Sequence, residues 1–121
     1  MQGRENVNDL DRLRDQLRRF AAARDWEQFH SPKNLAAALC VEAAELLEPF
    51  QWLTEAQSRA LPDDTREAVA GAMADVLLYL LQLADKLGVD LVQAAQRKMA
   101  INELRYPVER ARGSARKADT E

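Results

Sequence analysis

The stretch that decides the fold runs from residue 69 to residue 87 and reads VAGAMADVLLYLLQLADKL. Its apolar residues recur at helical spacing and form one main stripe: Val69, Met73, Val76, Leu80, Leu83 and Leu87. Three further leucines widen the stripe beyond a single face: Leu77, Leu78 and Leu81. A helix that is apolar on two sides must be buried on two sides. A small helical subunit cannot easily do this alone, so we expect self-association.

Helices are also expected on both sides of this stretch, over residues 8–24, 31–48 and 90–104, and the central helix starts near residue 63. Ser31 is a good N-cap, and Pro32 at the first helical position loses no hydrogen bond. Gly88 is a natural helix end, and Pro107 closes the last helix. A loop over residues 54–62 with a short helical turn connects the second and third helices. The fold class is therefore all-α, a four-helix bundle subunit.

The composition bounds the protein to one soluble domain with no preference for nucleic acid. The chain has 121 residues, 47% of them hydrophobic and 31% charged, and its net charge is −3. A helical DNA-binding dimer is disfavoured, because no basic recognition helix is present. We expect a domain over residues 1–110. Residues 111–121 form a polar, basic tail, either frayed or reaching towards phosphate or a neighbouring subunit.

Other features of the whole sequence bear on the cellular location of the protein. No apolar run approaches the roughly 20 residues of a membrane span, and the polar N-terminus is not a signal peptide. Cys40 is the single cysteine, so an internal disulfide cannot form and a cytoplasmic setting is expected. Cys40 stands in an Ala/Leu/Val run, which favours a small core residue over a nucleophile.

An acidic row lies on the second helix, where Glu42, Glu45 and Glu48 recur every three residues. Residues at this spacing are neighbours on one helix surface, and their like charges repel. A bound cation removes this cost, and hard cations such as Mg²⁺ choose carboxylate oxygens. The alternative is an ordinary solvated acidic face.

A second acidic signal is Asp75, which interrupts the apolar third helix. An unpaired carboxylate in so apolar a segment is expensive to bury, so it needs a metal, a cation or hydrogen bonds. Tyr79 lies one turn further along the same face.

The fourth helix carries Lys98, Asn102 and Tyr106 at intervals of four residues, and Arg105 adds a nearby cation. Such a row suits the oxygens of a polyphosphate, although an ordinary exposed amphipathic face has the same pattern.

Aromatic residues gather near the ends of the first two helices: Trp26, Phe29, His30 and Trp52. They could stack on a nucleobase or simply close the core. Walker, Rossmann and Ser-His-Asp motifs are missing from the sequence, which leaves metal-assisted attack by water as the expected chemistry.

Together these motifs resemble the all-α, MazG-like nucleoside triphosphate pyrophosphohydrolases, in particular their dCTP pyrophosphatase branch. The resemblance extends from about Leu10 to Lys117. It is carried by residues 24–30, by Glu42-x-x-Glu45, by Phe50-Gln51-Trp52, by residues 75–80 and by residues 98–107.

The resemblance implies Mg²⁺-dependent cleavage of a deoxynucleoside triphosphate, dCTP or a modified dCTP, to the monophosphate and pyrophosphate. Such a reaction clears unwanted nucleotides from the pool, a house-cleaning role. Matching the motifs residue by residue makes Glu42, Glu45 and Asp75 the metal-binding and catalytic carboxylates. It places Trp26, His30, Trp52 and Tyr79 around base and sugar, and Lys98, Asn102 and Tyr106 around the phosphates. A dimer or a dimer-based tetramer is implied, with no nucleic acid or membrane partner.

Position 72 departs from the family pattern. The metal motif is ExxE, a spacer and then ExxD, which requires Glu where this chain has Ala72. Losing even a supporting group around a metal costs roughly 10–100-fold, so we expect an impaired enzyme. The intact surroundings suggest an engineered Glu→Ala change, and a naturally impaired homologue is the alternative. A nucleotide-binding or interaction module without turnover stays open.

Overall fold

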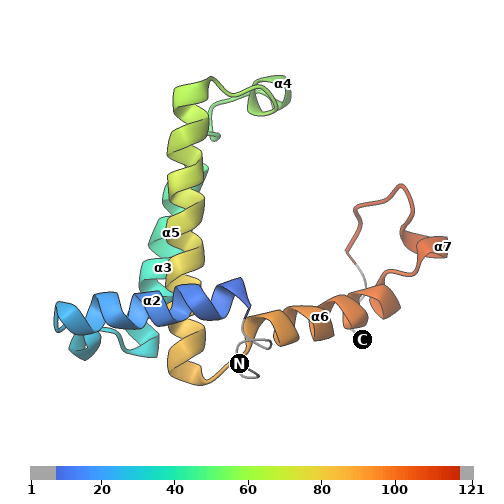
Figure 1. The fold of residues 1–121 in the computed structure, drawn as a ribbon. Helices are drawn as coiled ribbons and strands as arrows, with labels where there is room; N and C mark the ends of the chain where they lie inside the picture. The colour runs from blue at the N-terminus through green and yellow to red at the C-terminus, as the bar shows by residue number, and fades with distance from the viewer. Residues whose placement is uncertain (1–7, 118–121) are drawn as a thin grey trace. The chain divides into compact units, whose positions relative to one another are not determined.

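Helices form all the regular structure in the part of the chain that the computed structural model describes, residues 8–117 (Figure 1). In chain order they are α2 (Asp9–Ala23), the 3₁₀ helix η1 (Glu27–Phe29), α3 (Pro32–Leu47), α4 (Glu55–Ser58), α5 (Asp63–Leu87), α6 (Leu91–Arg105) and α7 (Val108–Ala111). The all-α prediction is confirmed, and the four long helices begin and end within a residue or two of their predicted bounds.

The predicted caps explain these bounds. The Asn8 side chain accepts a hydrogen bond from the Asp11 backbone N–H at 2.9 Å, and Ser31 Oγ accepts one from Asn34 N–H at 3.1 Å. Gly88 ends α5 with a φ of +68°, a left-handed conformation that favours glycine. Pro107 both follows α6 and caps α7, a short helix that the sequence reading did not predict.

The chain divides into two compact units, residues 1–88 and 89–121, and each is described by itself. The first holds α2 to α5, and the second holds α6 and α7. The predicted division into a domain over residues 1–110 and a tail over residues 111–121 stays a prediction. Ala111, the first residue of that tail, belongs to α7.

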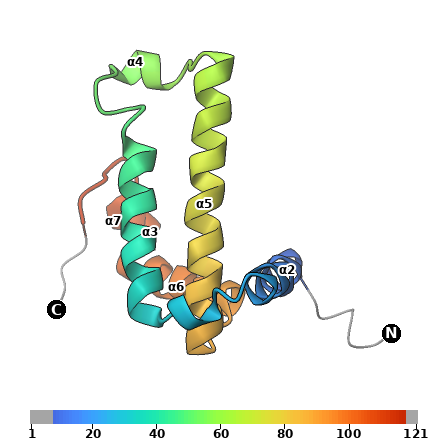
Figure 2. The same cartoon turned by 90° about the vertical axis from the view of Figure 1, so that its left-hand side faces the viewer.

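In the first unit, α3 and α5 lie side by side and α2 runs across the C-terminal half of α5 (Figures 1 and 2). Its core sits at these two contacts. Among the described residues the buried apolar side chains are Ala21, Leu35, Val69, Leu81 and Ala84. This core is small, because the two-sided apolar surface of α5 meets α3 and α2 over only part of its length.

Several apolar side chains of this unit remain exposed, including Val41 and Leu47 on α3 and Met73, Leu77 and Leu87 on α5. Cys40 is exposed too, so its prediction as a core residue was wrong. The apolar neighbours of Cys40 suggested burial, but the surface of α3 that carries it is not covered within this unit.

Helix α5 is long and apolar enough to cross a membrane by length and composition alone, with a mean hydropathy of 1.4 over its best window. The sequence reading counted uninterrupted apolar runs, whereas this average tolerates Asp75 and Gln82. Core helices of soluble proteins meet the same test.

Candidate active site

A cavity of about 360 Å³ opens between α2, α5 and the turn that links α2 to α3. Ligand pockets for small molecules commonly have this size. Its wall is mainly apolar and aromatic, with a few polar groups. The lining residues are Leu13, Gln16, Leu17 and Phe20 from α2, Trp26 and His30 from the turn, and Asp75, Leu78, Tyr79 and Gln82 from α5.

The backbone conformation at the C-terminal end of α2 places Trp26 at the wall of this cavity. Asp25 takes a left-handed conformation with φ of 56°, which Asp tolerates better than most residues. The Trp26 N–H donates to the Ala21 carbonyl at 3.0 Å, and the Asp25 N–H donates to the Ala22 carbonyl at 3.2 Å. This pair of bonds is the Schellman arrangement, which fixes where the chain leaves a helix. Trp26 is therefore placed by backbone geometry.

Two rings pack edge-on against Trp26. The ring centroid of Phe20 lies 5.6 Å away and that of His30 lies 6.4 Å away, both in T-shaped geometry. The Trp26 side chain stays 44% exposed. An aromatic side chain supported at its edges but still accessible can stack on a flat ring.

His30 sits between η1 and α3, and both of its neighbours are fixed. The His30 N–H donates to the Glu27 carbonyl at 3.1 Å. On the other side, the Asn34 side-chain amide donates to the Phe29 carbonyl at 3.0 Å while Ser31 caps α3. These short-range bonds fix the backbone on both sides of His30, whose side chain lines the cavity.

The acidic residues meet where α3 faces α5. A hydrogen bond shared with Glu45 raises the pKa of Glu42 above its ordinary value. Desolvation and the negative charges of Glu45 and Asp75 raise it further. The structure therefore brings the three predicted carboxylates into one electrostatic group. Asp75 is exposed in this unit, because its apolar neighbours on α5 are only partly covered.

The ligands of this group are of the kind that a hard divalent cation prefers, but too few carboxylates converge in the described part of the chain to make a complete site. Its donors are all carboxylate oxygens, and their mutual repulsion is what a cation or a proton relieves. Within residues 8–117, however, no three acidic, histidine or cysteine side chains converge as a ready metal site. Ala72, one turn before Asp75, adds no carboxylate. Glu48, the spare carboxylate, lies exposed at the C-terminal cap of α3.

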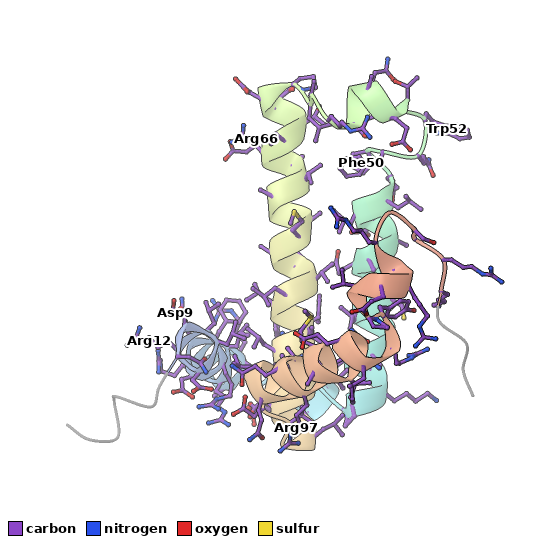
Figure 3. All side chains as sticks on the ribbon, turned by 90° about the vertical axis from the view of Figure 1, so that its right-hand side faces the viewer. Asp9, Arg12, Phe50, Trp52, Arg66 and Arg97 are labelled. Atoms are coloured by element: carbon purple, nitrogen blue, oxygen red, sulfur yellow. The ribbon has the colours of Figure 1, made fainter. Side chains whose placement is uncertain are left out.

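Three of the four residues predicted around base and sugar line the cavity: Trp26, His30 and Tyr79. Asp75 and Tyr79 share the cavity wall, as their spacing of four residues predicts. Trp52 does not line it. Figure 3 shows Trp52 with Phe50 beyond the end of α3, and its side chain is 87% exposed. The roles of all four in binding stay predictions.

The residues predicted around the phosphates belong to the second unit. Lys98 and Asn102 lie on α6, and Tyr106 caps its end with its N–H donating to the Asn102 carbonyl at 2.8 Å. The Arg105 guanidinium lies 5.8 Å from the centre of the Tyr106 ring. The three residues are thus aligned along one helix, and their approach to the carboxylates of the first unit stays a prediction.

Several cavity residues were missed by the sequence reading. Leu13, Leu17 and Phe20 recur at helical spacing, and this pattern alone does not distinguish ligand-facing from core-facing apolar residues. Gln16 and Gln82 gave a usable signal, since each is an amide beside an apolar helix stripe. Both could have been flagged as polar groups next to a buried surface.

The fold and the site define a class of all-helical protein with an aromatic cavity beside a group of carboxylates on two facing helices. The chain belongs to the MazG-like family, whose model matches residues 37–119. It is also similar to a crystal structure of a pyrophosphatase from Archaeoglobus fulgidus, with a TM-score of 0.79 and 39% identity. That match covers 84% of this chain and 95% of the other.

Among curated proteins the chain is similar to dCTP pyrophosphatase 1. It is 49% identical to the Mus musculus protein over 111 residues, which is 90% of this chain and 64% of that protein. It is 46% identical to the Homo sapiens protein over 113 residues, 92% of this chain and 65% of that protein. The chain thus spans just under two thirds of the length of these relatives.

Proposed function

We propose that this chain is a nucleoside triphosphate pyrophosphohydrolase of the dCTP pyrophosphatase type. It would act on dCTP or a modified dCTP with Mg²⁺, yielding the monophosphate and pyrophosphate and so clearing the nucleotide pool. One observation carries the proposal: Asp75 belongs both to the aromatic cavity and to the carboxylate group of Glu42 and Glu45. A nucleoside and its phosphates need such adjoining sites.

In this proposal the cavity binds the nucleoside. Trp26 stacks on the base, since it is held at its edges and still accessible. The Tyr79 hydroxyl and the His30 ring, which both line the cavity, offer hydrogen bonds to sugar or base. The apolar side chains of α2 exclude water from the remaining surface of the base.

The carboxylates serve the triphosphate. Glu42, Glu45 and Asp75 would hold Mg²⁺, which when bound neutralises phosphate charge and lowers the pKa of water. A carboxylate of this group would accept the proton of the attacking water as general base. The water oxygen bonds to the α-phosphorus, and the bond from that phosphorus to the bridging oxygen breaks. Pyrophosphate leaves with the negative charge.

Ala72 weakens this machinery in the proposal. Position 72 lies one helical turn before Asp75, so a glutamate there would face the same cation. Its loss, engineered or natural, leaves three carboxylates and a slower reaction rather than a different one.

Self-association completes the protein in the proposal, as a dimer or a tetramer in a cytoplasmic setting without nucleic acid or membrane partners. The exposed apolar side chains of α3 and α5, among them Val41, Leu47 and Met73, supply a surface for a second copy. The exposed Trp52 and the row of Lys98, Asn102 and Tyr106 would join the site in that assembly.

A second candidate is a nucleotide-binding module without turnover, and Ala72 is the feature that favours it. The cavity is intact in this chain while the carboxylate group lacks one member. A binding protein needs the first and not the second.

Calorimetry of the unchanged chain with dCTP and Mg²⁺, followed by chromatography of the products, separates these functions. We expect binding and the slow release of dCMP and pyrophosphate in equal amounts. Binding without any product over many hours supports the module instead. Products of dCDP and phosphate, or no binding at all, would contradict the proposed function.

A further inference from the structure

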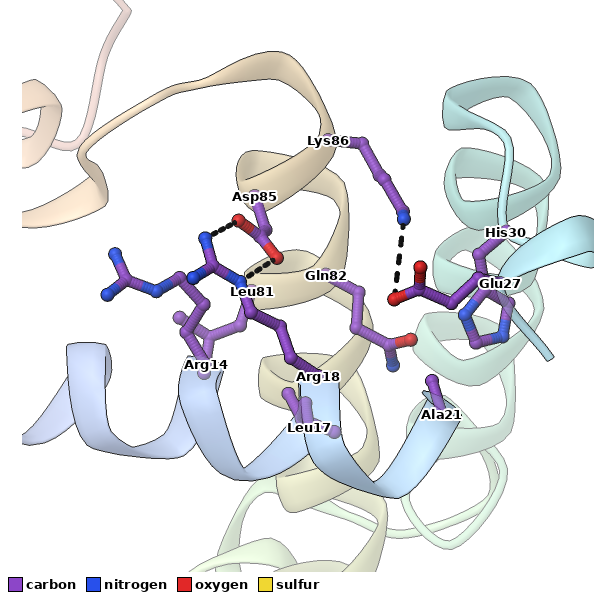
Figure 4. A pocket seen from close by; sticks show the side chains of 10 residues that line it. All are labelled: Arg14, Leu17, Arg18, Ala21, Glu27, His30, Leu81, Gln82, Asp85 and Lys86. Carbon is purple, nitrogen blue, oxygen red and sulfur yellow. Dashed lines mark hydrogen bonds and ion pairs between the residues drawn. The ribbon is translucent and has the colours of Figure 1, made fainter. Parts of the chain in front are cut away.

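A polar cluster outside the proposed site joins α2 to the C-terminal end of α5 (Figure 4). The Arg18 guanidinium donates two hydrogen bonds to the Asp85 carboxylate, from Nε at 2.8 Å and from Nη2 at 2.5 Å. Such fork-to-fork pairing fixes direction as well as distance. A single rotatable ammonium could not provide the same constraint.

The pair is stronger than a typical surface ion pair. The Asp85 side chain is only 19% exposed, whereas Arg18 is half exposed. The hydrogen bond from Arg18 lowers the pKa of Asp85, and it raises the pKa of Arg18 in return. Both shifts indicate that the charged pair is favoured in the folded chain.

A second link ties the Trp26–His30 turn to the same end of α5. Lys86 Nζ lies 4.0 Å from Glu27 Oε1, and Figure 4 shows this contact beside His30 and Gln82. Asp85 therefore anchors α2, while its neighbour Lys86 anchors the turn that follows α2. The two links act on adjacent parts of the chain.

The cluster adjoins the nucleoside cavity directly. It surrounds a small hollow whose wall includes Leu17, His30 and Gln82, and these three residues also line the nucleoside cavity. Arg18 follows Leu17 in sequence, and Asp85 lies three residues after Gln82. Any shift of α2 along α5 would therefore move one wall of the cavity against the other.

We propose that Arg18 and Asp85 are positioning residues that set the width of the nucleoside cavity by clamping α2 against α5. The proposal rests on the proposed function, because it assigns the cavity to the nucleoside. Neither residue touches the substrate. Their effect falls on the affinity for the nucleotide and leaves the reacting carboxylates in place.

The test compares Arg18→Gln, Asp85→Asn, the double variant and Arg18→Lys in the full chain. Arg12→Gln is the matched control, because Arg12 pairs with Asp9 inside α2 and both side chains are largely exposed. In the Ala72→Glu version we expect KM for dCTP to rise roughly fivefold to tenfold in each single variant, with kcat unchanged.

The double variant should cost no more than one single variant, since each residue acts through the other. The KM of Arg18→Lys should fall between that of the unchanged chain and that of Arg18→Gln. If Asp85→Asn fails to fold, the Arg18→Lys variant still tests the proposal. Equal KM in all variants, or losses that add in the double variant, would overturn the proposal.

A readout independent of turnover separates this proposal from the proposed function. In a Trp52→Phe background, acrylamide quenching reports Trp26 alone. Loss of the clamp should increase the quenching of Trp26 at unchanged helix content, and Arg12→Gln should not. If dCTP fails to bind even the unchanged chain, the proposed function fails, and the quenching result still decides the clamp. Unchanged quenching in Asp85→Asn and Arg18→Gln would overturn it.

Discussion

Helix α5 meets its two neighbours in opposite ways. Towards α2 it offers Asp85, whose charge is matched by Arg18 and whose pKa is lowered by that partner. Towards α3 it offers Asp75, whose charge faces Glu42 and Glu45 and helps to raise the pKa of Glu42. The first contact is stable by itself. The second leaves a repulsion that only a proton or a cation relieves, and such frustrated charges are typical of functional sites.

The largest expected effect comes from neutralising one of the carboxylates that repel one another between α3 and α5. In the Ala72→Glu version, Glu42→Gln should reduce dCTP hydrolysis by about 100-fold or more, because it removes a proposed metal ligand. Steady-state kinetics with Mg²⁺ measures this loss. Glu55→Gln, on the exposed helix α4, is the control and should leave the rate unchanged.

The same Glu42→Gln variant should not lose stability in the absence of metal. A raised pKa means that the folded state binds the proton more tightly than the unfolded state. Stability is therefore lost as pH rises from the ordinary glutamate value, about 4.3, through the raised value. Urea unfolding at pH 4 and pH 8 should show Glu42→Gln gaining relative to the unchanged chain at the higher pH. If Glu42→Gln were less stable than the unchanged chain at pH 8, the Glu42 carboxylate would not be repelled by Glu45 and Asp75.

A smaller effect is expected from the cavity wall. Trp26→Ala should weaken dCTP binding by about tenfold or more, since stacking of a base on an aromatic ring is worth about 1–3 kcal/mol. Calorimetry of the unchanged chain and the variant measures it. Phe29→Ala is the matched control, because Phe29 is an exposed aromatic of the same turn that does not line the cavity. Equal losses in both variants would argue against a stacking role.

The sequence predicts the charged contact between α3 and α5 better than the contact between α2 and α5. The proximity of Glu42, Glu45 and Asp75 was predictable, because helical spacing and the family motif both point to these residues. Ala72 was visible for the same reason. The helix bounds followed from Ser31 and Gly88, whose preferences are local.

The ion pair between α2 and α5 was not predictable. Arg18 and Asp85 are 67 residues apart, and no spacing rule connects charges on different helices. The exposure of Cys40 was misjudged, because burial depends on which helix faces are covered. Trp52 shows the same limit, since its neighbours in sequence did not reveal that it lies outside the cavity of this unit.

The smallest expected effect concerns the matched charges. Asp85→Asn should lower the free energy of unfolding at pH 7 by about 1 kcal/mol, a value kept low because Arg18 is half exposed. The lowered pKa of Asp85 means that this contribution is present above the ordinary aspartate value, about 3.9, and is lost as pH falls through the lowered value. The charges of Arg18, Arg14 and Lys86 all contribute to lowering the pKa of Asp85.

Urea unfolding of Asp85→Asn and the unchanged chain between pH 7 and pH 2 measures this difference. Asp9→Asn serves as control, because Asp9 is 92% exposed in its pair with Arg12. A difference that persists undiminished at the lowest pH would assign the loss to packing instead of charge.

The central proposal is that the carboxylates between α3 and α5 would form a metal site that lacks one member at position 72. The most direct measurement is the rate of dCTP hydrolysis with Mg²⁺ by the Ala72→Glu chain, beside the unchanged chain and Ala74→Glu. Position 74 adds the same charge to α5 on a different face. A gain of about 10–100-fold in Ala72→Glu alone is the expected result. Equal rates in Ala72→Glu and Ala74→Glu would contradict the account.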